Sequence, residues 1–291
     1  MPKARGEIPI LKGRRILLGV TGSIAAYKAA DLASKLAQAG AVVDTVLTES
    51  ATRFVSALTF QSLTGRSAHV DSDLWSQAGH VLHVGLAQAA ELLVIAPATA
   101  DTIAKLAHGR ADNLLSIAAL AATCPTIVAP AMDAGMFDHP ATQANLSTLR
   151  ERGINIVGPV EGRMASGLVG VGRMVELLEL VGHIRLSLGR GGPLNGKKVV
   201  VTAGGTQEPL DPVRVLANRS SGKQGFALAQ AALDRGAEVI LITAPTALAT
   251  PVGAARVDVE TAAQMAEAVG EALPQADALI MAAAVVDFRP R

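Results

Sequence analysis

The sequence has 291 residues, half of them hydrophobic, and its 26 Lys and Arg against 25 Asp and Glu leave a net charge of +1. This length and apolar content predict two domains, and the charge excludes the basic surface of a nucleic-acid binder. The single cysteine, Cys124, excludes an intrachain disulfide and fits a reducing cytoplasm. The first 15 residues lack the apolar core of a signal peptide. The apolar run 114–132 contains two prolines, so we expect a buried helix followed by a strand, and no membrane partner.

The first half opens with an apolar strand, a tight turn and a helix. Leu32 and Leu36 share one helical face, and Gly40 provides the residue that ends helices in the left-handed conformation. A second strand follows at once, which is the spacing of a parallel crossover unit. The expected strands of this half are residues 16–20, 42–47, 92–96 and 126–129.

The pattern restarts in the second half. A strand at 198–202 runs into a Gly-Gly turn, and a later helix ends at Gly236 before a strand at 238–242. Residues 236–243 parallel 40–48, and residues 276–287 parallel 90–101. The sequence therefore predicts a flavodoxin-like or Rossmann-like doubly wound parallel sheet followed by a second Rossmann-like α/β domain. The expected bounds are 14–181 for the first domain, 182–195 for a linker and 196–291 for the second.

The second domain is expected to be incomplete. The first half continues beyond Asp101 through a helix, a strand and a loop, whereas the second ends at Arg291. An open sheet without its later strands would leave an apolar edge uncovered, so a truncated chain explains the pattern better than a small natural domain.

The loop that joins the first strand to its helix is a candidate phosphate site. Gly22 and Ser23 stand where free backbone N–H groups and the helix dipole favour an anion. The dinucleotide fingerprint and the Walker lysine are absent, so a mononucleotide such as FMN fits better. The alternative is an ordinary helix start in which Ser23 is the N-cap.

Five segments of the first half resemble the flavoprotein family of homo-oligomeric cysteine decarboxylases. The last two of these segments resemble the family's substrate clamp and flap. The segments are VTGSIAAYK (20–28), HVGLA (83–87), APATADTIAK (96–105), PAMDAGMF (130–137) and ASGLVGVGRM (165–174).

This resemblance implies a role for FMN and a set of site residues. FMN oxidises a cysteine thiol to a thioaldehyde, whose C=S group accepts the electrons released on decarboxylation, and the enethiolate is then protonated and reduced. The implied flavin contacts are Gly22, Ser23, Thr48, Pro97, Ala98, Thr99 and Asp101. The implied substrate contacts are Asn113, Asp133 and Met136, and the implied catalytic residues are His83 and Ser166.

Each of these residues also has a structural interpretation. His83 suits proton transfer from a thiol, but it could equally be a buried histidine that caps a helix. Thr48 and residues 97–99 could be ordinary strand-end positions. Asp133 replaces the family's asparagine and only accepts hydrogen bonds when ionised. Either Asn113 or a protonated Asp133 would therefore have to donate to the substrate carboxylate. Ser166 replaces a cysteine acid and is a much weaker acid.

The second half resembles phosphopantothenate-cysteine ligase in the segments TAGGTQEPLDPVR (202–214), NRSSGK (218–223) and AAAVVD (282–287). The resemblance implies CTP-dependent activation of 4′-phosphopantothenate, with Mg²⁺ accompanying CTP and metal ligands that are unknown. The implied residues are Asn218 for the acyl intermediate and Gly204, Gly205, Met281, Ala282, Ala283 and Asp287 for CTP. Gly-Gly after a strand is also common in plain turns. We expect a chain that ends at Arg291 to lack ligase activity.

The order of the two halves is that of the bifunctional decarboxylase/ligase family of coenzyme A biosynthesis, which makes 4′-phosphopantetheine. Two alternatives stay open, a flavin decarboxylase of peptide C-terminal cysteines and a non-catalytic FMN-binding subunit. The resemblance implies a homo-oligomer, a trimer or an assembly of trimers, with FMN between subunits. A cytoplasmic location is expected.

Overall fold

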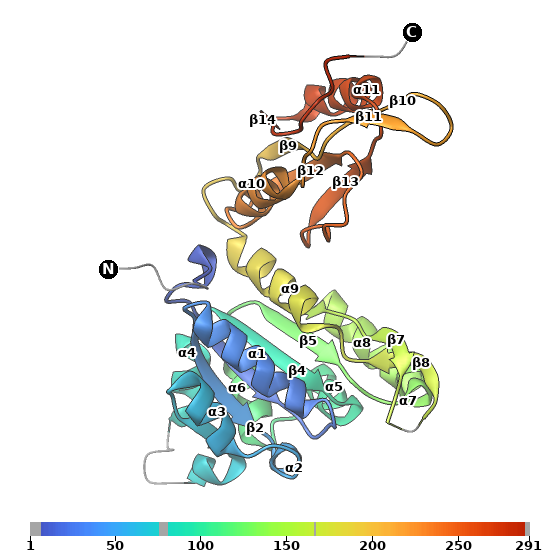
Figure 1. Cartoon of the computed structure of the whole chain (residues 1–291). Coiled ribbons are helices and arrows are strands. Elements are labelled where there is room, and N and C mark those ends of the chain that lie inside the picture. Colours follow the sequence, from blue (N-terminus) through green and yellow to red (C-terminus); the bar gives the residue numbers. More distant parts are fainter. Residues whose placement is uncertain (1–6, 76–80, 166, 289–291) are drawn as a thin grey trace. The chain divides into compact units, whose positions relative to one another are not determined.

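The computed structural model describes residues 7–75, 81–165 and 167–288, and the chain divides into two compact units (Figure 1). Unit 1 comprises Met1–Leu188 and unit 2 comprises Gly189–Arg291. No helix within the described residues is both long and apolar enough to cross a bilayer.

Unit 1 is built on a six-stranded sheet whose neighbouring strands all run parallel, in the order β3-β2-β1-β4-β5-β6. This is the strand order of the Rossmann fold. The strands are β1 (Arg15–Val20), β2 (Val42–Leu47), β3 (Ala68–Val70), β4 (Leu92–Ala98), β5 (Thr126–Pro130) and β6 (Asn155–Ile156). A separate antiparallel hairpin is formed by β7 (Val160–Arg163) and β8 (Val169–Arg173).

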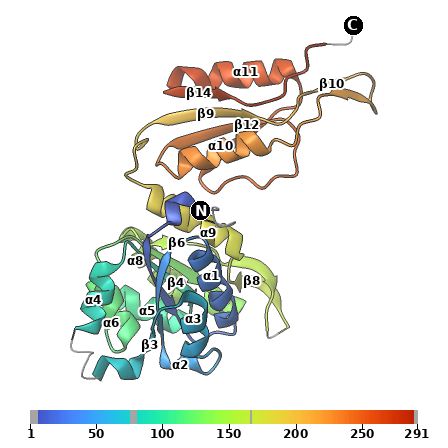
Figure 2. The ribbon, with the colours of Figure 1, turned by 60° about the vertical axis from the view of Figure 1, so that its left-hand side comes forward.

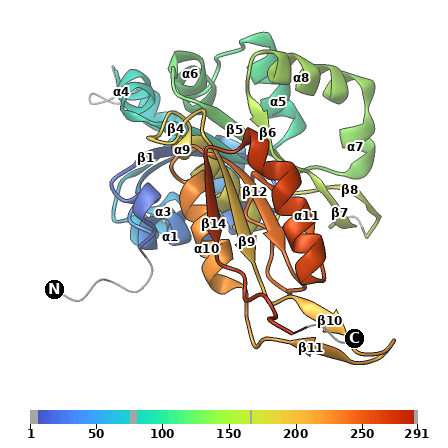
Figure 3. The same ribbon diagram turned by 90° about the horizontal axis from the view of Figure 1, so that it is seen from above.

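Helices cover both faces of this sheet. The longer ones are α1 (Ala26–Gln38), α3 (Ala57–Thr64), α4 (Leu82–Ala89), α5 (Ala100–His108), α6 (Leu114–Ala121), α8 (Pro140–Glu151) and α9 (Leu177–Gly189). The short ones are α2 (Glu49–Thr52), α7 (Ala134–Asp138) and the 3₁₀ turns η1 (Pro9–Leu11) and η2 (Asp71–Trp75). Figures 2 and 3 show α1 and α3 on one side of the sheet and α4 and α6 on the other.

Two hydrophobic cores follow from the alternation of side chains along the strands. Ile16 and Leu18 of β1 pack into a core with α1, α3 and α9, whereas Leu17 between them packs into a core with α5, α6 and α8. Gly19 lets α6 approach the sheet, because a Cβ there would lie 2.5 Å from Leu115 Cδ1. The unit is therefore a three-layer α/β/α sandwich.

The sequence patterns explain several of these elements. Leu32 and Leu36 are fully buried, and α1 ends before Gly40, which has φ +97° as expected. The run 114–132 forms helix α6 and strand β5, as predicted. The first eight residues of the expected linker instead continue helix α9, because Ile184 and Leu188 pack into the core of unit 1.

Unit 2 has a four-stranded parallel sheet in the order β13-β12-β9-β14. This order matches β3-β2-β1-β4 of unit 1, which confirms the internal comparison of the two halves. The strands are β9 (Lys198–Ala203), β12 (Glu238–Thr243), β13 (Ala254–Asp258) and β14 (Ala278–Met281). The other elements are α10 (Lys223–Leu233), α11 (Ala262–Ala272), η3 (Leu273–Gln275) and the hairpin β10 (Gln207–Pro209) with β11 (Val215–Ala217).

Candidate functional site

The sheet of unit 1 has a topological switch point between β1 and β4. Helix α1 leaves the end of β1 toward one face and α5 leaves the end of β4 toward the other, which opens a crevice at the carboxyl ends of both strands. Thr21 joins the two strand ends. Its Oγ1 donates to Pro97 O at 2.7 Å and accepts from Thr99 N at 3.1 Å, and the side chain is buried.

A cavity of about 630 Å³, here called the switch-point cavity, lies at these strand ends. This is within the usual size range of small-molecule sites, about 300–1,000 Å³. It brings together six residues predicted from sequence: Gly22, Thr48, Thr99, Asp101, Asn113 and Met136. Seven others complete the lining: Glu49, Ser50, Asp71, Ala100, Thr102, Lys105 and Asp112.

Three of the predicted residues are helix caps. Thr48 Oγ1 accepts from Ala51 N at 3.3 Å, Thr99 Oγ1 accepts from Thr102 N at 3.3 Å, and Asn113 Oδ1 accepts from Ser116 N at 2.8 Å. These bonds fix the starts of α2, α5 and α6 at the rim of the cavity. These three residues therefore both stabilise helix starts and line the candidate site.

Gly22 permits a close approach that no other residue allows. A Cβ at this position would lie 2.4 Å from Ser50 Cβ, well inside van der Waals contact. The turn after β1 and the start of α2 therefore touch each other at the cavity wall. Ser23 precedes helix α1 without being its N-cap, since Ala25 holds that position and Ser23 Oγ accepts from Ala25 N at 3.2 Å.

Three of the four acidic side chains that line the cavity, those of Asp71, Asp101 and Asp112, have donor partners. Asp71 accepts from Glu49 N at 2.9 Å and from Leu114 N at 3.0 Å, so it connects the starts of α2 and α6. Lys105 Nζ lies 3.3 Å from Asp101 and 3.2 Å from Asp112. Burial alone lowers the pKa of Lys105, but hydrogen bonds and charges from the two carboxylates raise it above the ordinary value.

Those pairs leave Lys105 cationic at neutral pH. The hydrogen bond from Lys105 also lowers the pKa of Asp112, with a smaller contribution from Arg110. The cavity lining thus combines hydroxyl groups and backbone with a cluster of paired charges.

A second cavity of about 570 Å³, here called the hairpin cavity, lies between the start of α1, the loop after β5 and the β7–β8 hairpin. Two predicted residues line it, Ser23 and Asp133. Asp133 is the N-cap of α7, and its Oδ1 accepts from Gly135 N at 3.1 Å. Asn113 and Asp133 line different cavities, so this chain does not present Asn113 as a donor in the cavity of Asp133.

The clamp loop and the hairpin are joined directly. Met132 N donates to Gly172 O at 3.0 Å, and Ala134 N lies 3.2 Å from Met164 Sδ. A Cβ on Gly172 would lie 2.3 Å from Met132 O, so the hairpin can approach the loop only with glycine at this position. The predicted clamp and flap therefore form one connected wall.

Four predicted residues of unit 1 lie elsewhere or outside the described chain. Pro97 and Ala98 are buried within β4 and line neither cavity. His83 is half-buried on α4 and also lines neither cavity, and its Nδ1 is buried with no hydrogen-bond partner among the described residues. Ser166 lies outside the described residues.

In unit 2 the predicted nucleotide residues gather at the ends of β9 and β14. Thr202 Oγ1 accepts from Ala282 N at 3.1 Å and from Ala283 N at 3.2 Å. Ala284 N donates to Gly204 O at 2.8 Å, and Asn218 Nδ2 donates to Val285 O at 2.9 Å.

The remaining predicted residues of unit 2 flank this assembly. A Cβ on Gly205 would lie 2.8 Å from Asn218 O, so the glycine permits this approach. Met281 ends β14 with 68% of its surface exposed, and Asp287 follows as an exposed residue. The described residues contain no group of three or more His, Cys, Asp or Glu that could hold a metal ion.

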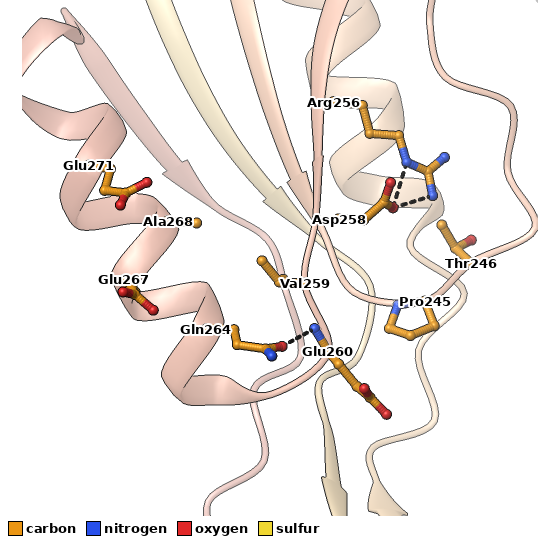
Figure 4. Close-up of a pocket in the computed structure, with 10 residues that line it drawn as sticks. All are labelled: Pro245, Thr246, Arg256, Asp258, Val259, Glu260, Gln264, Glu267, Ala268 and Glu271. Carbon is orange, nitrogen blue, oxygen red and sulfur yellow. Dashed lines mark hydrogen bonds and ion pairs between the residues drawn. The ribbon is translucent and has the colours of Figure 1, made fainter.

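A further cavity of unit 2, of about 700 Å³, lies between β13 and α11 and contains none of the predicted CTP residues (Figure 4). Arg256 pairs with Asp258 at 2.7 Å, and Gln264 accepts from Glu260 N at 2.7 Å. Gln264 completes the capping box of α11 with Thr261. Thr261 and Gln264 stabilise the start of α11.

Sequence reasoning missed residues that connect segments distant in sequence. Thr21, Thr202 and Thr206 each hold the end of one strand to a loop that follows another. Asp71 and Lys105 carry the charges of the switch-point cavity. The sequence did contain a signal for the three threonines, because each one flanks a glycine turn at a strand end within a segment quoted above.

Comparison with known proteins identifies both halves. Residues 9–189 match the family described as Flavoprotein, and residues 194–291 match the DNA/pantothenate metabolism flavoprotein C-terminal domain. The chain is 48% identical over 282 residues to the coenzyme A biosynthesis bifunctional protein CoaBC of Mycobacterium bovis, covering 95% of this chain and 67% of that protein.

Two solved structures resemble unit 1. A PPC decarboxylase mutant complexed with pantothenoylaminoethenethiol has a TM-score of 0.55 at 36% identity, over 60% of this chain and 98% of the other. The FMN binding protein AtHal3 has a TM-score of 0.52 at 35% identity, over 60% and 96%. The chain therefore belongs to the Flavoprotein family and to the family of coenzyme A biosynthesis bifunctional proteins CoaBC.

Proposed function

We propose that this protein acts in coenzyme A biosynthesis, with domain 14–181 decarboxylating 4′-phosphopantothenoylcysteine to 4′-phosphopantetheine and residues 196–291 belonging to a ligase of 4′-phosphopantothenate and cysteine. One observation carries the first activity. Residues of three separate sequence motifs, together with Thr48 and Asn113, converge on the switch-point cavity of a chain in the CoaBC family. The match of residues 194–291 to a pantothenate-metabolism domain favours this substrate over a peptide.

The switch-point cavity fits FMN. Its glycine turn packs directly against Ser50, where a Cβ on Gly22 would clash, so the turn after β1 and the start of α2 form one wall of the cavity. Gly22, Thr48, Ser50 and Thr99 offer backbone and hydroxyl groups for phosphate and ribityl oxygens, and the acids Asp71 and Asp101 already have donor partners. Bound there, FMN would supply reversible two-electron oxidation of the substrate thiol.

His83 is assigned as the base that takes the thiol proton. The residue lines neither the switch-point cavity nor the hairpin cavity. This position supports a role at the site of a neighbouring subunit, and the family resemblance then implies a trimer or an assembly of trimers. Ile24, Tyr27 and Met136 line the two cavities and expose 60%, 61% and 51% of their surfaces, which suits burial by a second copy.

Ser166 is assigned as the flap residue that supplies or positions the final proton. The PPC decarboxylase neighbour was captured with an aminoethenethiol, an unsaturated thiol, as a cysteine-to-serine mutant. That species is the product expected when oxidation and decarboxylation proceed but protonation is slow. A chain with serine at the flap is therefore expected to release its product more slowly than one with cysteine.

In the second domain the loop of Gly204 and Gly205, together with Ala282 and Ala283, is assigned to CTP, and Asn218 to the acyl intermediate. Met281 and Asp287 flank this loop and complete the assignment. The hydrogen bonds from both alanine amides to Thr202 support one rigid nucleotide loop. Mg²⁺ would enter with CTP, and a cytoplasmic location suits all of these substrates.

The test uses the purified chain with added FMN. Carbon dioxide release is measured with 4′-phosphopantothenoylcysteine and, in parallel, with a peptide that ends in cysteine. Flavin release on denaturation and release of carbon dioxide from the first substrate only are the expected results. Turnover of the peptide alone would replace the proposed substrate, and failure to bind FMN would refute the flavin assignment.

A further inference from the structure

Asp71 is an acidic residue in a cavity that we assign to an anionic ligand. It is the first residue of η2, directly after strand β3, and it lines the switch-point cavity. A phosphate group such as that of FMN carries up to about two negative charges at neutral pH, and a carboxylate in the same cavity repels it. Asp71 therefore weakens FMN binding unless it has a second effect that favours the ligand.

The two oxygens of the Asp71 carboxylate have different partners. Oδ2 accepts from Glu49 N at 2.9 Å, and Oδ1 accepts from Leu114 N at 3.0 Å. The two donors are the first residues of α2 and α6, which lie 22 and 43 residues away from Asp71 in the sequence. Leu114 is fully buried, so loss of its acceptor would leave a buried donor without a partner.

The amides that Asp71 holds come directly after two predicted ligand contacts. Thr48, a predicted flavin contact, precedes Glu49, and Asn113, a predicted substrate contact, precedes Leu114. Each contact residue shares a planar peptide group with the amide that follows it, so fixing the amide also fixes the carbonyl end of the contact residue. One carboxylate therefore sets the spacing between Thr48 and Asn113.

The surroundings of Asp71 hold it in place from the sheet. Val70 of β3 pairs with Leu47 of β2, so Asp71 and Thr48 leave the ends of neighbouring parallel strands side by side. Asp73 Oδ2 accepts from Val70 N at 2.9 Å and fixes the turn of η2. The carboxylate of Asp71 is thus anchored to the same strand ends that carry the cavity.

We propose that Asp71 is a positioning residue that couples the flavin side of the switch-point cavity to its substrate side. When FMN contacts Thr48, the start of α2 loses mobility, and Asp71 passes that restraint to the start of α6 and to Asn113. The second ligand then loses less conformational entropy on binding, and the gain is reciprocal. This inference rests on the proposed decarboxylase function.

Two substitutions separate positioning from charge. Asp71→Asn keeps the shape but has one acceptor oxygen, so one amide loses its partner. Asp71→Glu keeps the charge on a longer side chain, which cannot hold both amides at the present spacing. Titration of flavin fluorescence should show FMN affinity at least about 10-fold lower in both variants.

The matched control is Asp73→Asn. It makes the same change on η2, at a residue that also accepts a backbone hydrogen bond but lines neither the switch-point cavity nor the hairpin cavity, so FMN affinity should stay unchanged. Tighter FMN binding in Asp71→Asn would show that charge repulsion dominates and would overturn the proposal. Unchanged FMN affinity in Asp71→Glu would overturn it as well, because charge alone would then suffice.

A second measurement distinguishes coupling from a general loss of stability. In the unmutated protein, 4′-phosphopantetheine should tighten FMN binding about 5- to 150-fold, and in Asp71→Asn this factor should fall to about 1. A variant that is only destabilised would bind both ligands more weakly and keep the factor. If both ligands bind to the unmutated protein independently, or the factor survives in Asp71→Asn, the coupling alone is refuted. If the unmutated protein binds no FMN or no 4′-phosphopantetheine, the proposed function fails and the coupling fails with it.

Discussion

Thr21 is the residue whose loss we expect to disturb the switch point most clearly. Its hydroxyl donates to Pro97 O and accepts from Thr99 N in a buried setting, so a single side chain holds the ends of β1 and β4 together. Thr21→Val keeps the shape but leaves one buried acceptor and one donor without a partner. Each costs about 1–3 kcal/mol, so the total destabilisation should be about 2–6 kcal/mol.

Two measurements test this expectation. The urea unfolding transition of unit 1 should show a lower free energy of unfolding. The slope of that free energy against urea concentration should stay unchanged. Hydrogen exchange should show faster exchange of the Thr99 amide, since its acceptor is gone. Thr21→Ser keeps the hydroxyl and is the matched control, expected to lose only the contacts of one methyl group. Equal stability and equal Thr99 exchange in Thr21→Val and the unmutated protein would refute the assignment of Thr21 as the connection between the strands.

Three further changes test the site. Gly22→Ala should weaken FMN binding at least about 10-fold by forcing the turn away from Ser50, and an unchanged flavin titration would argue against close approach at this turn. His83→Asn should retain FMN but stop thiol oxidation, so unaltered turnover would mean that another base acts. Ser166→Cys should speed formation of 4′-phosphopantetheine without changing carbon dioxide release. Mass spectrometry checks this, because the stalled product is two hydrogens lighter, and equal rates for both steps would remove Ser166 from the role of acid.

The sequence determined the parts of the fold that depend on local periodicity. The strands beginning near Ile16 and Leu92 are continuous apolar runs, and the strand beginning at Val42 is apolar apart from Asp44 and Thr45, as expected for parallel strands buried on both faces. The helix end before Gly40 needed a residue with positive φ. The repeat of the same strand order in both units was visible because the same turn chemistry recurs at matching positions.

Short and polar strands escaped prediction because their stability comes from neighbours. β3 has three partly buried residues, and β7 and β8 alternate exposed residues with glycines, so neither gives a strong apolar pattern. Helix α9 extended into the expected linker because burial of Leu188 against unit 1 outweighs the nearby glycines. Local composition alone cannot report such burial.

The candidate site, like the fold, could be predicted from the sequence only in part. Motifs selected Gly22 and Thr99, a strand-end position selected Thr48, and Asn113 was selected as a donor near the clamp; strand-end turns and helix caps are local features. Only the tertiary structure placed Asp133 in a separate cavity with Arg163 and left His83 outside both cavities. The physical reason is that cavities form where segments remote in the chain meet at the carboxyl edge of the sheet, and that meeting is set by strand order and packing rather than by spacing in the sequence.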